Sequence, residues 1–447
     1  MSKALISIFR IPDLRNKILF TLGIIIVYRL GAFVPTPGID GQALSRFFDE
    51  FARTQGSTLF GIMNMFTGGA MKQLTVFALG IMPYISASII LQLLTSVVPQ
   101  LEKLAKEPDG RQKMTQYTRY ATVILCVIQA FFISMWLENP AHFGGVTVVS
   151  FPGWGFRFLA VITLTAGTML IMWLGEMITA KGIGNGISLI ITAGIVSRMP
   201  AALSLLVSAL SPLNPAQRQM EPVTIIIMLV LLVGVIVSVI LITQGQRKIP
   251  VQYAKRVVGR KVYGGQSTYI PLRVNMAGVI PIIFAQSLIL FPATIAGIVP
   301  AQGLRTFASW LTRGQVAYTV IYSLLIIFFT YFYTAVVFNP QDAAENMKRY
   351  GGFVPGIRPG KATAEYFEYI LGRITLPGAI FLAFIAVFPD IVGKSLKIPS
   401  LVASFLGGTG ILIIVGVMLD TMRQIESQLL MRHYEGFMQK GRLRGRR

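Results

Sequence analysis

Charged residues are scarce in this sequence of 447 residues: 13% are Asp, Glu, Lys or Arg, whereas 54% are hydrophobic. A water-soluble fold carries charge on roughly a quarter of its residues. The low charge therefore excludes an ordinary soluble globular protein and indicates a membrane protein before any motif is considered.

Cysteine and histidine are also nearly absent. The chain has one cysteine, Cys126, and two histidines, His142 and His433. A single cysteine excludes a disulfide within the chain. Neither histidine has a Cys, His or carboxylate at metal-ligand spacing, so the sequence predicts no metal site and no cofactor. Catalytic motifs are missing as well, and we expect the protein not to be an enzyme.

Acidic and basic residues are rare inside the apolar segments. Arg29, Glu176 and Asp420 lie in or next to such segments, each near a predicted membrane interface. Long side chains there reach the interface by snorkelling. An ion-coupled transporter needs charge at mid-membrane, so this class is disfavoured, although a secondary transporter with an inverted repeat stays as the alternative function.

Long apolar segments are abundant, and most reach the roughly 20 residues that a helix needs to cross a bilayer. Lipid offers no partner to backbone groups, so these segments are expected to be helices. The sequence thus predicts an all-α polytopic membrane protein with ten spans. They are Ile18–Val34, Leu74–Val98, Ala121–Leu137, Gly155–Met177, Ile187–Leu206, Val223–Thr243, Met276–Val299, Ala317–Phe338, Ile374–Ile391 and Leu401–Leu419.

The basic residues are distributed unequally between the two sides of the membrane. The formal net charge is +22, and 29 of the 40 Lys and Arg fall on the side that holds the N-terminus. Cytoplasmic loops carry an excess of Lys and Arg. We therefore expect both termini to lie in the cytoplasm, in agreement with an even number of spans.

Two of the predicted cytoplasmic loops are long and basic, 244–273 and 339–373. Loops of this length are uncommon unless they are functional. One interpretation is that their charges only set topology. The other, which we favour, is that they are docking surfaces for a partner.

The ten spans divide naturally after the fifth. Because five is odd, the second half would have the opposite topology to the first, which is the plan of an inverted repeat around a central pathway. We expect an N-terminal half at 1–206, a C-terminal half at 207–422, and a cytoplasmic tail at 423–447.

Leu59–Ala70 (LFGIMNMFTGGA) is apolar but too short to span a bilayer. Such a length predicts a re-entrant or interfacial segment. Its glycines loosen a helix and permit unusual dihedral angles. An amphipathic helix resting on the outer interface is the alternative interpretation.

Five sequence motifs are distinctive. They are MFTGGA at 65–70, GIMPYISASII at 80–90, GIGNGIS at 182–188, VNMAGVIP at 274–281, and Asn339-Pro340 followed by GFVPGIRPG at 352–360. These motifs resemble those of the SecY family, the pore-forming subunit of the bacterial Sec protein translocase, and they occur in family order and spacing over the whole chain.

The resemblance implies a channel in the inner membrane that passes unfolded secretory proteins and releases transmembrane segments sideways into lipid. It also implies a pore ring of aliphatic side chains. A narrow aliphatic collar blocks ions by dewetting, because it cannot replace their hydration. The matching residues are Ile81, Ile85, Ile187, Ile191, Ile283 and Ile413.

In this family a short apolar plug seals the pore from the outer side. The resemblance places the plug in this chain at Leu59, Phe60, Gly61, Ile62, Met63, Asn64, Met65, Phe66, Thr67, Gly68, Gly69 and Ala70. The fold we expect is therefore two pseudo-symmetric halves of five helices with a short re-entrant plug helix.

The family's side exit lies between the second and seventh spans. Pro83 and Pro281 each remove a helix hydrogen bond and are expected to bend their spans. Gln92 and Asn275 are polar in or beside these spans, and an amide pair would hold the gate shut weakly. Ordinary helix packing by the two amides is the alternative.

The basic loops are expected to dock partners. The resemblance implies SecE, SecG, the SecA ATPase, the ribosome, and signal peptides and nascent polypeptides, besides membrane lipid. Ribosomal RNA would be met through its phosphates. For any single lysine, topology or lipid headgroup contact is the alternative. The docking residues are Arg247, Lys255, Arg256, Arg260, Lys261 and Arg358.

Overall fold

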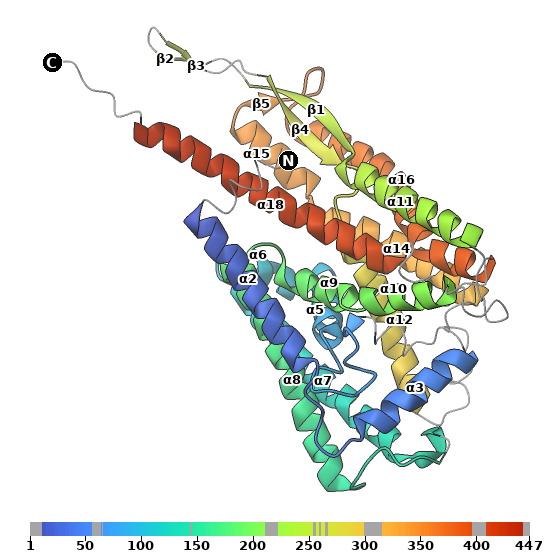
Figure 1. The fold of residues 1–447 in the computed structure, drawn as a ribbon. Helices are drawn as coiled ribbons and strands as arrows, with labels where there is room; N and C mark the ends of the chain where they lie inside the picture. Colours follow the sequence, from blue (N-terminus) through green and yellow to red (C-terminus); the bar gives the residue numbers. More distant parts are fainter. Residues whose placement is uncertain are drawn as a thin grey trace.

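The computed structural model describes most of the chain, in segments separated by short gaps. The described residues are 11–55, 64, 66–143, 145–210, 222–253, 256–258, 261–263, 267–298, 315–395 and 408–440. Figure 1 shows that helices make up most of this part of the molecule.

The helices of the first half of the chain begin with a 20-residue helix and include two long neighbours, α7 and α8. In chain order they are α2 (Pro12–Gly31), α3 (Gly41–Gln55), α5 (Met82–Val97), α6 (Pro99–Lys106), α7 (Gly110–Glu138), the short 3-10 helix η1 (Pro140–Phe143), α8 (Trp154–Lys181), α9 (Gly186–Val196) and α10 (Met199–Leu210).

The second half of the chain contains further long helices and all of the described strands. Its helices are α11 (Pro222–Gln244), α12 (Ile280–Ile298), α14 (Val316–Val337), α15 (Pro340–Arg349), α16 (Lys361–Ser395) and α18 (Thr409–Lys440). Its strands are β1 (Gln246–Tyr253), β2 (Arg256–Val258), β3 (Lys261–Tyr263), β4 (Ser267–Arg273) and β5 (Gly352–Phe353).

Each predicted span carries a helix or a pair of helices, so the prediction of a helical polytopic membrane fold is confirmed. Within the described residues, six helices are long and apolar enough to cross a membrane, or seven if the bent pair α5–α6 counts as one span. The total of ten spans stays a prediction. α2 is not among these six helices because it carries several charges: Asp13, Arg15, Lys17 and Arg29 all lie within its 20 residues.

The helices of the second and seventh spans start later than their hydropathy predicts. Residues 67–81 form turns, apart from a β-bridge between Thr75 and Pro35, and α5 begins at Met82. Likewise α12 begins at Ile280. In each case a glycine with positive φ precedes the helix, Gly80 at 58° and Gly278 at 63°. This conformation is strained for residues with a side chain, so each glycine separates a turn from the helix that follows.

Pro83 and Pro281 lie in the first turn of α5 and α12, as the second residue of each helix. The first-turn N–H groups of a helix have no intrahelical acceptor, so proline costs nothing there and its fixed φ favours the helix start. The prediction that these prolines bend their spans is therefore wrong: they begin helices.

Several helices extend beyond the membrane segments predicted for them. α7 begins 11 residues before Ala121, and α16 begins 13 residues before Ile374. α18 continues to Lys440, so the predicted boundary between the C-terminal half and the tail falls inside a continuous helix.

The helices form two groups that follow the order of the sequence. In Figure 1 the blue-to-green helices α2, α5, α7 and α8 lie below, and the green-to-red helices α11, α14 and α16 lie above. Contacts between the groups come from α12 packing against α5 and α7, and from α18 packing against α9. A single apolar core contains residues from both groups, including Ile85 and Ile171 from the first and Ile283 and Leu412 from the second.

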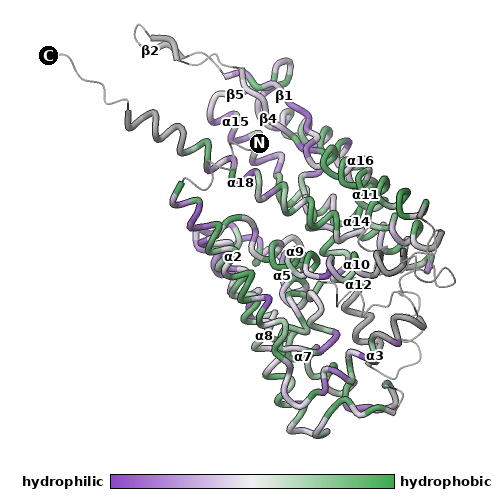
Figure 2. The backbone as a smooth tube through the Cα atoms, in the orientation of Figure 1, coloured by the Kyte–Doolittle hydropathy of each residue, from purple (hydrophilic) through white to green (hydrophobic). Residues whose placement is uncertain are grey.

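The two long basic loops contain strands, which the sequence analysis did not predict. β1 pairs antiparallel with β4, and its far end pairs with β5, giving the order β4-β1-β5. The register joins Gln252 to Phe353 and Tyr253 to Gly352, so the loops 244–273 and 339–373 form one unit. Figure 2 shows hydrophobic colour along the long helices and more hydrophilic colour at this end of the molecule.

Candidate functional site

The six residues of the predicted pore ring lie in the interior of the molecule. Five of them are at most 5% exposed and belong to the shared core: Ile81, Ile85, Ile191, Ile283 and Ile413. Ile187 is partly buried and packs against the same core. The described helices thus bring together residues from sequence positions more than 300 apart. Their role as a ring stays a prediction.

The predicted plug is described only in part. Leu59, Phe60, Gly61, Ile62, Met63 and Met65 lie outside the described residues. Asn64 and Phe66 are helical and buried, whereas residues 67–70 form turns. Thr67 and Ala70 are each 1% exposed. The described part of the plug is therefore helical at Asn64 and Phe66 and continues as a turn that buries Thr67 and Ala70.

Local hydrogen bonds make this turn compact. The Asn64 side-chain oxygen accepts from the backbone N–H of Lys72 at 3.0 Å, and its carbonyl accepts from Gly69 at 2.9 Å. The Thr67 hydroxyl accepts from the N–H of Met71 at 3.2 Å. Gly68 and Gly69 have φ of 65° and 98°, which explains why two adjacent glycines stand here.

The two predicted gate helices are in contact. α5 packs against α12, and the Ser287 hydroxyl lies 4.0 Å from the sulfur of Met82. Both side chains are buried, at 2% and 8% exposure. A thioether sulfur is a weak acceptor, so this contact adds little beyond packing.

The predicted amide pair between Gln92 and Asn275 is wrong for this conformation. The Gln92 amide donates to Ser88 at 3.1 Å within α5, and the Asn275 amide donates to the carbonyl of Gly278 at 3.0 Å. The side-chain oxygens of both residues are buried without a hydrogen-bond partner. Each amide donates to an acceptor three or four residues away in its own segment, which is nearer than the other amide.

Sequence analysis missed a buried amide on α12. Gln286 is 2% exposed, and its side-chain nitrogen has no hydrogen-bond partner. It lies one residue before Ser287, on the helix that packs against α5 and α7. A glutamine in an apolar span was the available signal, because burial of an unpaired amide is costly.

The basic docking residues that are described lie on or beside the three-stranded sheet. Arg247 is exposed on β1, and Arg358 is exposed in the glycine- and proline-rich loop that follows β5. Arg256 begins β2 and Lys261 begins β3, a separate hairpin. Lys255 and Arg260 lie outside the described residues, as do the side chains of Arg256 and Lys261.

A small apolar core fixes the relative position of Arg247 and Arg358. Ile249 and Val251 of β1 pack with Val354 beside β5 and with Phe367 of α16. Thr363 donates to the carbonyl of Arg358 at 2.8 Å and anchors its loop. The alternation of Ile249 and Val251 with exposed residues was the strand signal that the sequence analysis passed over.

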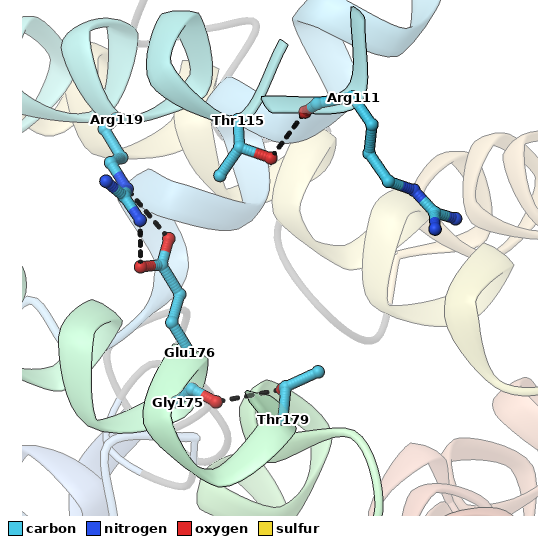
Figure 3. Close-up of polar contacts among 6 residues, drawn as sticks. All are labelled: Arg111, Thr115, Arg119, Gly175, Glu176 and Thr179. Carbon is cyan, nitrogen blue, oxygen red and sulfur yellow. Dashed lines mark hydrogen bonds and ion pairs between the residues drawn. The ribbon is translucent and has the colours of Figure 1, made fainter. Parts of the chain in front are cut away.

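The three charged residues noted near the interfaces have partners in the structure. Glu176 of α8 accepts two hydrogen bonds from the Arg119 guanidinium of α7, at 3.1 and 2.7 Å (Figure 3). Asp420 lies 3.5 Å from Arg423 on α18. Arg29 donates to the carbonyl of Gly68 at 3.1 Å. Pairing adds to the snorkelling that the sequence predicted, and a two-point arginine–carboxylate pair also fixes helix orientation.

Comparisons with known proteins agree with this arrangement. The SecY family model matches residues 75–422. The Protein translocase subunit SecY of Streptomyces coelicolor is 48% identical, over 98% of this chain and 100% of that protein. The chain belongs to the SecY family. The Escherichia coli K12 member is 45% identical, over 97% of this chain and 96% of that protein.

Solved structures show the same fold at lower identity. A structure described as that of a protein conducting channel has a TM-score of 0.65 at 19% identity, and covers 92% of this chain and 91% of that one. Sec61 from the canine ribosome-channel complex has a TM-score of 0.62 at 20% identity, and covers 92% of this chain and 91% of that one.

Membership of the SecY family decides between the two functions left open by the sequence. The chain is a protein-translocase channel subunit and not an enzyme, and the alternative of a secondary transporter is not supported. The apolar helices make it a multi-pass membrane protein.

Proposed function

We propose that the chain forms a pore between its two halves, 1–206 and 207–422, in the bacterial inner membrane. Unfolded secretory proteins pass through the pore, and apolar segments leave sideways between α5 and α12. The observation that carries this proposal is the burial of Ile85 of α5 and Ile283 of α12 in one core shared by both groups of helices.

The pore ring is the proposed barrier to ions. Ile81, Ile85, Ile187, Ile191, Ile283 and Ile413 supply branched aliphatic carbons without a hydrogen-bonding group. Ions find no replacement there for their hydration shell, and a narrow apolar passage excludes water. The same side chains adapt to any passing polypeptide because they offer it no specific contact.

Two similar helix starts support the proposed pseudo-symmetry of the halves. Gly80-Ile81-Met82-Pro83 precedes and begins α5, and Gly278-Val279-Ile280-Pro281 precedes and begins α12. Each combines a glycine of positive φ with a proline three residues later. α5 and α12 are the second helical spans of their halves, as an inverted repeat requires.

The sheet β4-β1-β5 is the proposed docking surface for the SecA ATPase and for the ribosome. It presents Arg247 and Arg358 on one rigid support, and the neighbouring hairpin adds the backbone positions of Arg256 and Lys261. Phosphates of ribosomal RNA are suited to such arginines, and their binding weakens with added salt. For this role the sheet and both termini must lie on the cytoplasmic side. SecE and SecG are the proposed partners within the membrane.

Deletion of residues 59–70 is expected to raise the ion leak of the idle channel. The described part of this segment fills buried space next to the core that holds Ile81, so its removal leaves the ring as the sole barrier. The measurement is conductance of resting channels in a planar bilayer, with export of a secretory precursor as the control for folding. A channel that exports normally and never leaks, even transiently, would show that the segment is not a seal.

A further inference from the structure

Arg29 is an unusual residue at its position in the fold. It lies in the last turn of α2, among exposed apolar neighbours such as Val27 and Leu30, and its own side chain is partly buried. A cation is favoured near a helix C-terminus, which explains why α2 tolerates it. That general effect needs no specific partner, yet the Arg29 side chain has one.

The partner of Arg29 is the backbone of the plug segment, 39 residues away in the sequence. The Arg29 guanidinium donates to the carbonyl of Gly68 at 3.1 Å. It also lies over the ring of Phe33, with 5.2 Å to the centroid. Among the described residues, Arg29 forms no ion pair with a carboxylate.

Two further hydroxyl groups contact the plug segment, at Gly68 and at the residue before it, Thr67. The hydroxyl of Tyr28, a residue that is 2% exposed, lies 3.5 Å from the carbonyl of Thr67. The hydroxyl of Ser197, just after α9, lies 3.5 Å from the carbonyl of Gly68, although its shorter bond is to Gly194 at 2.6 Å. Thus α2 and α9 approach the segment from two sides.

The fit around Gly68 is tight. A Cβ atom added at Gly68 would lie 3.0 Å from the Cα of Gly194 and 3.1 Å from the Arg29 guanidinium. A Cβ added at Gly194 would lie 2.9 Å from the carbonyl oxygen of Phe66. Adjacent Gly69 has open space around it. Of the two adjacent glycines, only Gly68, the residue that Arg29 binds, is closely packed.

We infer that Arg29 is a positioning residue that latches the plug segment in its sealed place. This inference deepens the proposed function and rests on it, because it assumes that the segment at 59–70 moves. A hydrogen bond from a charged donor is stronger than one between neutral groups, and the bond from Arg29 is partly buried. The latch acts on the backbone, so it does not depend on the side chains of the plug.

Loss of the latch changes the balance between seated and displaced plug. A hydrogen bond to a charged group shifts an equilibrium by roughly ten- to a hundred-fold. Arg29→Gln keeps a shorter, neutral donor, and is expected to raise the displaced fraction by roughly tenfold. Arg29→Lys keeps the charge and one donor, and is expected to recover most of the seal.

Two readouts on the full-length chain, purified with its partner subunits, test the latch. The first is the resting ion leak in planar bilayers. The second is the rate of thiol labelling of Ala70→Cys in a Cys126→Ser chain. Ala70 is 1% exposed and has no positive φ, so its labelling reports displacement of the plug whether or not the plug seals. Arg29→Gln is expected to raise both readouts. The matched control is Arg157→Gln, because Arg157 of α8 pairs with Glu138 and not with the plug.

The deletion of 59–70 separates the latch from the seal. In that background Arg29→Gln is expected to add no further leak. An added leak there, or unchanged labelling and leak in the intact chain, overturns the latch. If the deletion itself does not leak while Arg29→Gln still speeds labelling, the seal is wrong and the latch stands. Arg29→Lys behaving like Arg29→Gln despite normal amounts in the membrane also overturns it.

Discussion

Joining α5 to α12 covalently is expected to lower the rate of export of secretory proteins by at least roughly tenfold. The contact of Ser287 with Met82, at 4.0 Å, gives the positions for Met82→Cys and Ser287→Cys in a Cys126→Ser chain. The two helices come from the two groups of helices that contact each other, and the proposed side exit lies between them. If they cannot separate, neither the pore nor the exit can widen.

The reason for the large effect is that the hydrogen bond between α5 and α12 is weak. Interhelical hydrogen bonds in membranes average below about 1 kcal/mol, and the serine–thioether contact is weaker than most. Gln286, the residue before Ser287 on α12, is buried without a hydrogen-bond partner for its side-chain nitrogen, and this burial costs free energy in the closed conformation. A covalent bond prevents the separation of α5 from α12, which weak contacts otherwise allow.

Precursor export into membrane vesicles, before and after oxidation or treatment with a short bifunctional thiol reagent, measures the effect. Chains with only one of the two cysteines provide the control, and a reductant is expected to restore export when a disulfide was formed. Continued export by the crosslinked chain would show that the side exit does not lie between α5 and α12.

Charge reversal at Arg358 is expected to reduce SecA-driven export by at least roughly tenfold, while insertion of membrane proteins continues. Arg358 is exposed, and the chain around it is held by the bond from Thr363 at 2.8 Å and by the buried side chain of Val354. The anchored backbone lowers the conformational entropy that binding costs, and an arginine forms two-point hydrogen bonds with a carboxylate.

Arg349→Glu is the matched control for Arg358→Glu. Arg349 is also exposed and basic, but it lies on α15 and pairs with Glu345 at 3.3 Å. Exposed pairs of this kind contribute little to stability, roughly 0.3–0.5 kcal/mol. Both variants make the same change in net charge. Equal loss of export in both would point to general repulsion, and normal export by Arg358→Glu would refute its docking role.

Hydropathy alone located the helices well because lipid forces an apolar segment to satisfy its own backbone. The start of α5 could not be read this way, since Leu74–Ile81 is as apolar as the helix that follows. The turn there depends on Gly80 at φ 58° and on tertiary contacts of Phe77 and Leu79, which are buried away from lipid. Hydropathy does not distinguish burial in protein from burial in lipid.

The sheet and the partners of the charged residues could not be predicted from the sequence, for a different reason. β5 has two residues, and it pairs with a strand about 100 residues earlier in the chain. No local pattern specifies such a pairing. Arg29 was read as a snorkelling residue because its partner is a backbone carbonyl, which carries no sequence signal. The amides of Gln92 and Asn275 were predicted to pair, but nearer acceptors satisfied their donors.

A stalled secretory precursor can show whether a pore lies between the two groups of helices. Photo-crosslinkers in place of Ile85 and Ile283, both at most 5% exposed, are expected to react with the translocating chain. Ile90 of α5 and Leu288 of α12, at 43% and 40% exposure, are the matched controls on the same helices. We expect precursor crosslinks from the first pair and few from the second. Crosslinks from Ile90 and Leu288 alone would contradict a pore between the halves.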